Sequence, residues 1–201
     1  MGLRGVPSGR VFLLDKEITN LPTRERIRRG VSYIPEDRQK RGLVLDFSVA
    51  ENLILGSQNQ EPFQSGFARL NLSAISRYAE ELTNAFQIRT PNTDAQARSL
   101  SGGTQQRVVL ARELSRDPKL VIASQPTRGL DVGATEYVRS KLVEIRDRGS
   151  AVLLISADLD EIMALSDRVA VLYEGQIVAL TDASNTSEEE LGLSMAGGRI
   201  A

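Results

Sequence analysis

The stretch at residues 100–106 reads LSGGTQQ, and apolar residues at helical spacing follow it at Val108, Ala111 and Leu114. A helix that begins after Ser-Gly-Gly has several backbone N–H groups that are unpaired and unshielded by side chains. The positive end of the helix dipole lies at the same place, so the site suits an anion, above all a phosphate. The Ser101 hydroxyl can add one donor. The alternative is an ordinary helix N-cap with a flexible glycine lead-in.

Apolar strands and helices alternate along most of the chain. We expect strands at residues 10–15, 31–34, 120–123, 151–155, 168–172 and 176–180. Helices are expected at 132–146 and 159–165, in a short basic segment that Thr23 caps and that runs through Arg29, and after the capping-box pair Ser187 and Glu190. This alternation predicts an α/β layered fold with mainly parallel core strands.

Residues 48–100 have a different character, because they are polar and helical and contain no strand pattern. A helix should begin near Ser48, which has Glu51 at capping-box spacing. Residues 57–70 should form a loop, and Asn71 or Ser73 should open a second helix. We therefore expect an inserted helical subdomain over residues 48–100, within a single domain that spans residues 1–201.

Composition excludes several classes of function. The chain has 201 residues, 41% of them hydrophobic, and a formal net charge of -1, which gives no basic surface for nucleic acid. It contains no cysteine and no histidine, so disulfides, thiolate nucleophiles, imidazole bases and metal sites built on these ligands are excluded. No apolar run reaches the length of a membrane span. We predict a cytosolic protein without a metal site of its own.

Three further motifs follow the LSGGT stretch in a fixed order. An apolar strand ends in KLVIASQ at residues 119–125, the sequence RGLD occupies residues 128–131, and ISADLDE occupies residues 155–161. This set resembles the ABC ATPase family, in which these segments are the signature, the Walker B strand, the D-loop and the switch region. The resemblance covers essentially the whole chain and implies an ABC-type layered fold.

Within that family, YIPEDR at residues 33–38, QPTRGLDVGA at residues 125–134 and MAGG at residues 195–198 are most similar to the second half of duplicated ATPases. Those ATPases serve importers of simple sugars and nucleosides. The chain contains no GxxxxGK[ST] phosphate loop. In the family that loop precedes the segment matched by residues 2–15, so we expect an N-terminal truncation and a missing phosphate-loop strand.

Four internal positions depart from the catalytic pattern that the resemblance implies. Ser124 and Gln125 stand where the Walker B strand should end in Asp-Glu, so the Mg²⁺ ligand and the general base are replaced by neutral groups. Ala157 stands where active relatives carry histidine, and Glu36 where a glutamine senses the γ-phosphate. We expect this chain alone to be catalytically inactive; simple drift at the strand end is the alternative for Ser124 and Gln125.

The resemblance implies that two halves enclose ATP head to tail. This half would present Ser101, Gly102, Gly103 and Thr104 to ATP held by a catalytically competent partner half, and Mg²⁺ would enter only through that partner. Arg128 and Asp131 would lie at the interface between the halves.

Some of these residues also have simpler explanations. Asp131 is equally suited to cap the helix near Val132. Asp158, Asp160 and Glu161 could be mistaken for a catalytic carboxylate pair, but their place at a helix start favours stabilisation of the helix dipole.

The implied partners are a competent ABC half, the membrane permease and, indirectly, a substrate-binding protein, at the cytoplasmic face of the inner membrane. Residues 36–38 and 48–57 would face the permease, unless they form an ordinary solvated surface. Two other functions stay open: a scaffold that contacts no nucleotide, and a non-transport ABC ATPase on ribosomes or DNA. Because a central strand is expected to be missing, the isolated chain should be poorly stable or associate.

Overall fold

A computed structural model of the chain describes residues 1–66 and 69–198. The chain forms two compact units, Met1–Leu153 and Leu154–Ala201. The boundary falls inside strand β7 (Ala151–Ile155). Each unit is described below by itself.

A three-stranded sheet forms the centre of the first unit, in the order β3 (Val31–Ile34), β6 (Leu120–Ser124), β7. Strands β3 and β6 run parallel, with Val31 opposite Leu120 and Ile34 opposite Ala123. Val31, Ile34 and Ala123 are buried. Parallel pairing of strands that lie far apart in sequence requires a long crossover, which residues 35–119 supply. The predicted α/β fold with parallel core strands is confirmed.

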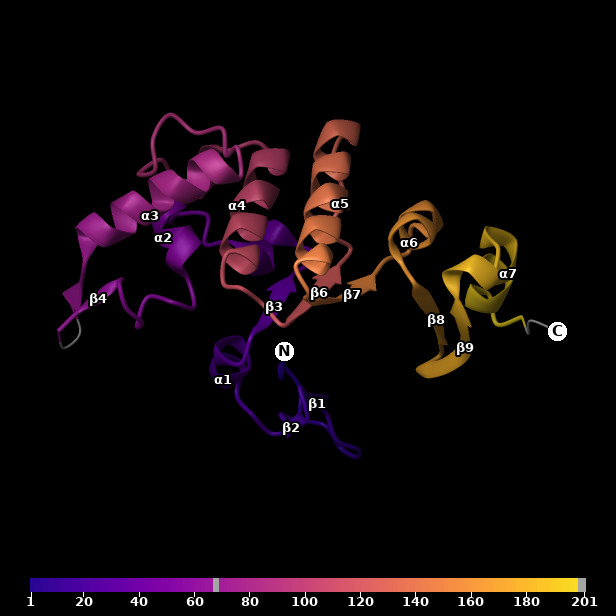
Figure 1. Cartoon of the computed structure of the whole chain (residues 1–201). Helices are drawn as coiled ribbons and strands as arrows, with labels where there is room; N and C mark the ends of the chain where they lie inside the picture. Colours follow the sequence, from indigo (N-terminus) through magenta and orange to yellow (C-terminus); the bar gives the residue numbers. More distant parts are fainter. Residues whose placement is uncertain (67–68, 199–201) are drawn as a thin grey trace. The chain divides into compact units, whose positions relative to one another are not determined.

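Helix α4 (Gly102–Leu114) is the central helix of this unit. It contacts β3, α2 (Val49–Ile54), α3 (Leu72–Ala85) and α5 (Val132–Asp147). Figure 1 shows α4 and α5 side by side, with α2 and α3 on the other flank of α4. Because neighbours surround it, α4 has a buried run at Val108–Ala111 and no exposed residue along its length. Helix α1 (Thr23–Arg28) precedes β3 and contacts it.

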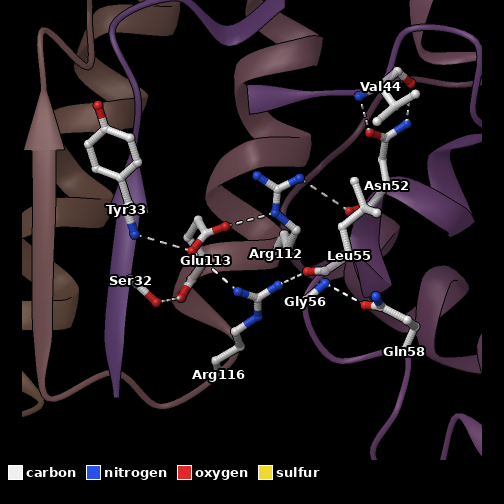
Figure 2. Close-up of polar contacts among 10 residues, drawn as sticks. All are labelled: Ser32, Tyr33, Val44, Asn52, Leu55, Gly56, Gln58, Arg112, Glu113 and Arg116. Atoms are coloured by element: carbon white, nitrogen blue, oxygen red, sulfur yellow. Dashed lines mark hydrogen bonds and ion pairs between the residues drawn. The ribbon is translucent and has the colours of Figure 1, made fainter. Parts of the chain in front are cut away.

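A buried polar network joins β3, α4 and the end of α2 (Figure 2). The Glu113 carboxylate accepts hydrogen bonds from Arg112 Nε at 2.8 Å and from Arg116 Nη1 at 3.4 Å. It also accepts one from the Tyr33 backbone N–H at 3.2 Å. Arg116 in turn donates to the Leu55 carbonyl. One carboxylate therefore pairs with the buried Arg112 and the partly buried Arg116, and through Arg116 it connects the sheet to the end of α2.

Asn52 of α2 extends this network into the preceding loop. Its side chain is fully buried. The amide oxygen accepts from the Val44 N–H at 2.9 Å, and the amide nitrogen donates to the Val44 carbonyl at 2.9 Å and the Ser48 carbonyl at 3.0 Å. Its own backbone carbonyl accepts from Arg112 Nη1 at 3.4 Å. The side chain thus supplies the partner of the Val44 N–H. It also adds a second donor to the Val44 and Ser48 carbonyls, which already accept from the Phe47 and Asn52 backbone N–H groups.

The second unit packs two helices against an antiparallel hairpin. Its elements are α6 (Leu159–Leu165), β8 (Arg168–Tyr173), β9 (Gln176–Asp182), the 3₁₀ turn Ala183–Asn185 and α7 (Glu188–Met195). Val169, Val171 and Leu191 form its core. The predicted capping box of Ser187 and Glu190 is present at the start of α7.

The structure corrects the predicted strand at residues 10–15. Only Phe12–Leu13 (β1) is a strand, and it pairs antiparallel with Lys16–Glu17 (β2). Leu14 and Asp15 turn the chain with φ values of 47° and 60°. Phe12 and Leu14 are exposed, so this apolar run forms only a small two-stranded hairpin and does not contribute these side chains to the core.

Thr23 is the first residue of α1, and its hydroxyl donates to the Met1 carbonyl at 3.1 Å. The predicted Thr23 cap is therefore wrong. Pro22 occupies the N-cap position, and the helix ends one residue before the predicted Arg29.

The sequence pattern predicted that the segment over residues 48–100 contains no strand, and this prediction is wrong. A short hairpin of β4 (Gln64–Ser65) and β5 (Arg69–Leu70) lies in the expected loop, and a 3₁₀ turn, Ala97–Ser99, lies shortly before α4. A single π-helical turn, η1 (Arg38–Gly42), follows the loop after β3. The caps Ser48 and Asn71 are confirmed. The short pairs carry too few residues to leave a periodic pattern.

Candidate functional site

The helix start at residues 101–104 is an N-cap with two open amides. Ser101 caps α4, and its Oγ accepts from the Thr104 backbone N–H at 3.3 Å. The Ser101 and Thr104 hydroxyls lie 3.0 Å apart. The N–H groups of Gly102 and Gly103 donate to no acceptor in the described part of the chain. The helix start therefore has features of both alternatives predicted from the sequence. Ser101 is an N-cap, and the N–H groups of Gly102 and Gly103 are available to a ligand.

Two buried glutamines fix this helix start to its surroundings. Gln105 Nε2 donates to the Ala97 carbonyl at 3.0 Å, and Gln105 Oε1 accepts from Gln39 Nε2 at 3.0 Å. Gln106 Nε2 donates to the Pro126 carbonyl at 2.7 Å. Both glutamines belong to the LSGGTQQ stretch, but the sequence pattern did not predict that they bind these backbone carbonyls. They hold the first turn of α4 against segments before and after it.

The two glycines are crowded by side chains from other segments. A Cβ on Gly102 would lie 2.7 Å from Arg38 Nη2. A Cβ on Gly103 would lie 3.3 Å from the Ala134 Cβ and 3.9 Å from Asp131 Oδ2. A side chain at Gly102 would thus displace a neighbour, and one at Gly103 would meet a tight contact.

The loop after β3 reaches the segment predicted as the D-loop. Arg38 Nη1 donates to the Arg128 carbonyl at 3.0 Å, and Nη2 to the Gly129 carbonyl at 3.5 Å. The Arg128 guanidinium in turn pairs with the Glu36 carboxylate. Glu36, which stands at the predicted γ-phosphate-sensing position, therefore has a cationic partner within the chain. Sequence reasoning missed the role of Arg38, because it depends on contacts with residues about ninety positions away.

Asp131 caps helix α5. Its Oδ1 accepts from the Ala134 N–H at 2.8 Å. The capping role is confirmed, and Asp131 is also exposed beside Gly103, so the predicted interface role remains open. Exposed Arg128, on the same segment, likewise stays a predicted interface residue.

Strand β6 delivers Ser124 and Gln125 to one end of the sheet. Ser124 is the last residue of the strand, and both residues are partly buried. Gln125 has a φ of 47°, and its carbonyl accepts from the Arg128 N–H at 3.1 Å, which starts the turn into the D-loop segment. Neither side chain carries a negative charge, so neither can neutralise Mg²⁺ or accept a proton from water.

Ala157 belongs to the second unit. It is exposed and directly precedes Asp158, which caps α6 through the Glu161 N–H at 3.1 Å. This confirms the helix-start role of Asp158. Glu161 is fully buried, and neither of its carboxylate oxygens accepts a hydrogen bond from a described residue.

The donor set at residues 101–104 fits a phosphate group. Two glycine amides, a hydroxyl and the positive end of a 13-residue helix converge there, and a guanidinium lies beside Gly102. Across residues 1–66 and 69–198, no group of three or more acidic, histidine or cysteine side chains could hold a metal ion. This donor set suits the phosphates of a nucleotide and includes no carboxylate for Mg²⁺.

Asp37 sits between Glu36 and Arg38 and orders this loop. Its carboxylate accepts from the Lys40 N–H at 3.0 Å and the Gln39 N–H at 3.1 Å, capping η1. The Lys40 backbone hydrogen bond is the main reason that the pKa of Asp37 is lowered from its ordinary value of 3.8. The aspartate is therefore a structural anion in this loop at neutral pH.

The family model for ABC transporters matches residues 1–128 of the chain. The chain belongs to the ABC transporter family. Solved ABC cassettes share its fold: a nucleotide-free ATP-binding cassette from an ABC transporter superposes with a TM-score of 0.74 at 24% identity, covering 97% of this chain and 76% of the cassette. A dimeric cassette in a post-hydrolysis state with ADP and Pi gives 0.70 at 24% identity, covering 88% and 74%.

Within the ABC family, curated import proteins are more similar in sequence. The guanosine import ATP-binding protein NupO of Bacillus subtilis (strain 168) is 49% identical over 98% of this chain, and 38% of that protein is covered. The nucleoside import ATP-binding protein NupA of Lactococcus lactis subsp. cremoris is 46% identical, covering 99% and 39%. The ribose import ATP-binding protein RbsA of Bacillus cereus is 34% identical, covering 98% and 39%. The chain thus spans about two fifths of the length of these relatives.

No helix in the described ranges combines the length and apolar character that a bilayer span requires.

Proposed function

We propose that this chain is the ATP-binding half of an ABC importer that contributes Ser101, Gly102, Gly103 and Thr104 to ATP held by a second ABC half. One observation carries the proposal: two open glycine amides and a serine hydroxyl form the start of a long, buried helix. A pre-ordered set of donors suits an anion that a partner delivers, because little ordering remains to be done on binding. Arg128 and Asp131, exposed beside this helix start, would meet the partner half.

We also infer that this half does not hydrolyse ATP by itself. Ser124 and Gln125 end the strand with neutral groups, and Ala157 offers no side-chain donor or base. Glu36 is paired with Arg128, so it is engaged within the chain. Mg²⁺ would accordingly be held by residues of the partner half.

The transported solute would be a nucleoside or a simple sugar, since the similar proteins are named for guanosine, nucleoside and ribose import. The chain would bind the permease peripherally, at the cytoplasmic face of the membrane, and meet a substrate-binding protein only indirectly. A hollow of about 340 Å³ borders this proposed permease-facing region at Gly56 and is otherwise lined by Arg24 and Ile27 of α1 and by residues 58–60.

The test of the proposal is Ser101→Arg in the assembled transporter. A bulky cation at the helix start would block the approach of the partner's nucleotide, and we expect ATP hydrolysis to fall by about a hundredfold, as when a site loses a preorganised donor. The matched control is Ser187→Arg, because Ser187 is also an exposed N-cap serine, with its Oγ 3.3 Å from the Glu190 N–H.

Equal ATP hydrolysis and solute uptake in Ser101→Arg and the wild type would overturn this proposal and favour a scaffold that contacts no nucleotide. Strong, salt-dependent binding to nucleic acid would instead favour a non-transport ABC ATPase.

A further inference from the structure

Arg38 lies where three motifs meet, and its backbone is firmly placed. It is the first residue of η1, a turn that the Asp37 carboxylate caps through two backbone N–H groups. The next residue, Gln39, donates to Gln105 of α4 at 3.0 Å. The base of the Arg38 side chain is thus tied to both the loop after β3 and the first turn of α4.

The guanidinium of Arg38 holds the segment after β6. Its two terminal nitrogens donate to successive carbonyls, those of Arg128 at 3.0 Å and Gly129 at 3.5 Å. Hydrogen bonds from a charged donor are stronger than neutral ones, and the planar fork of arginine can hold two acceptors at once. The Glu36–Arg128 ion pair closes the same connection from the other direction. Its side chains are 48% and 67% exposed, so this pair contributes less than the Arg38 contacts.

The same guanidinium occupies the space beside Gly102. A Cβ at that position would stand 2.7 Å from Arg38 Nη2, closer than such atoms approach. Any side chain there would have to push the guanidinium away from the Arg128 and Gly129 carbonyls. Gly102 therefore leaves the space that the Arg38 guanidinium occupies, and a side chain there would have to shift the flexible end of Arg38.

We propose that Arg38 is a positioning residue: its guanidinium, seated against Gly102, holds the start of α4 and the Arg128–Gly129 backbone in one fixed arrangement. The donors at residues 101–104 are thereby set in register with Asp131 before a partner half arrives. The proposal that this arrangement aids ATP binding rests on the function proposed above, whereas the contact between Arg38 and Gly102 does not.

The first test is a double-mutant cycle on the unfolding of the full chain. Gly102→Ala should lower Tm by about 2–4 °C, the shift that about one displaced hydrogen bond gives in a chain of this size. In an Arg38→Ala background the same substitution should leave Tm unchanged or raise it, because alanine favours a helix more than glycine does. Additive effects of the two substitutions would overturn the inference, whatever Ser101→Arg does to ATP hydrolysis.

The second test separates positioning from bulk stability. In the assembled transporter, Arg38→Ala should raise the KM for ATP by about tenfold, which is the loss of one charged hydrogen-bond pair, while kcat stays within about twofold. Arg38→Lys should resemble Arg38→Ala, because an ammonium lacks the fork that spans two carbonyls. Arg28→Ala is the control, since Arg28 pairs at 3.0 Å with Glu25 on α1.

A wild-type KM in Arg38→Ala would overturn the positioning role. Full rescue by Arg38→Lys would also overturn it, because it would assign the effect to charge alone. If Ser101→Arg leaves ATP hydrolysis intact while the Gly102–Arg38 coupling is present, the function proposed above fails and the contact inference survives.

Discussion

Glu113 offers the most direct test of how β3, α4 and the end of α2 are held together. Glu113→Ala would remove the acceptor shared by Arg112, Arg116 and the Tyr33 N–H (Figure 2). The side chains of Arg112 and Arg116 are only 7% and 13% exposed, so water cannot easily replace the lost carboxylate. Burial and the neighbouring Arg112 charge already lower the pKa of Arg116, and Glu113 opposes that shift.

The expected cost follows from this geometry. Leaving buried charges unpaired costs about 3–5 kcal/mol. For a chain of this length, each kcal/mol corresponds to about 2–4 °C, so Tm should fall by about 10 °C. Glu113→Gln keeps an acceptor oxygen but no charge and should cost about half as much.

Urea unfolding followed by far-ultraviolet circular dichroism measures these differences. Glu25→Ala serves as the control, because Glu25 makes an exposed ion pair with Arg28 at 3.0 Å and should cost about 0.5 kcal/mol. If Glu113→Ala costs no more than about 1 kcal/mol beyond this control, the network does not hold the inserted helices to the sheet.

Three other substitutions test separate features. Asp37→Asn should lower Tm more at about pH 6 than at about pH 3. The lowered pKa of Asp37 stabilises the fold above the ordinary value of 3.8, and that contribution is lost as pH falls through the folded pKa. A difference in Tm that does not depend on pH would contradict this. Glu161→Met should stabilise the second unit by about 1–3 kcal/mol, because the buried carboxylate has no hydrogen-bond partner among the described residues. Slower amide hydrogen exchange in β8 and β9 would report this stabilisation, and faster exchange would refute the prediction. Tyr137→Phe should cost about 1 kcal/mol in urea unfolding, because it removes the 2.9 Å hydrogen bond from the Tyr137 hydroxyl to the Phe86 carbonyl but keeps the ring under Arg107. Tyr137→Ala removes the ring as well and should cost clearly more. Equal costs of the two substitutions would show that the ring contact contributes nothing.

Helix caps and buried strands could be predicted from the sequence because their signals are local. Ser101, Asp131 and the Ser48–Glu51 box cap the helices that the pattern indicated. The strand at residues 31–34 was also predicted with its observed bounds. In each case a few neighbouring residues determine the backbone, so no tertiary information is needed.

The failures have a common physical origin in partners that are distant in sequence or missing from the local pattern. The run at residues 10–15 is apolar enough for a strand, yet the chain turns at Leu14 and Asp15, so only a hairpin of two-residue strands forms. The role of Arg38 depends on Arg128 and Gly129, which only the fold brings to it. A single sequence contains the residues of such contacts but no measure of their proximity.

The guanidinium beside Gly102 also restricts how this protein can evolve. A change from glycine at position 102 requires the Arg38 guanidinium to shift, and replacing Arg38 by a smaller residue first removes that requirement, so the order of the two changes matters. In an alignment of relatives, positions 38 and 102 should therefore vary together, as should the charges at 36 and 128. A lineage that has lost the arginine would be free to lose the glycine as well, and its LSGG motif should drift first at that position.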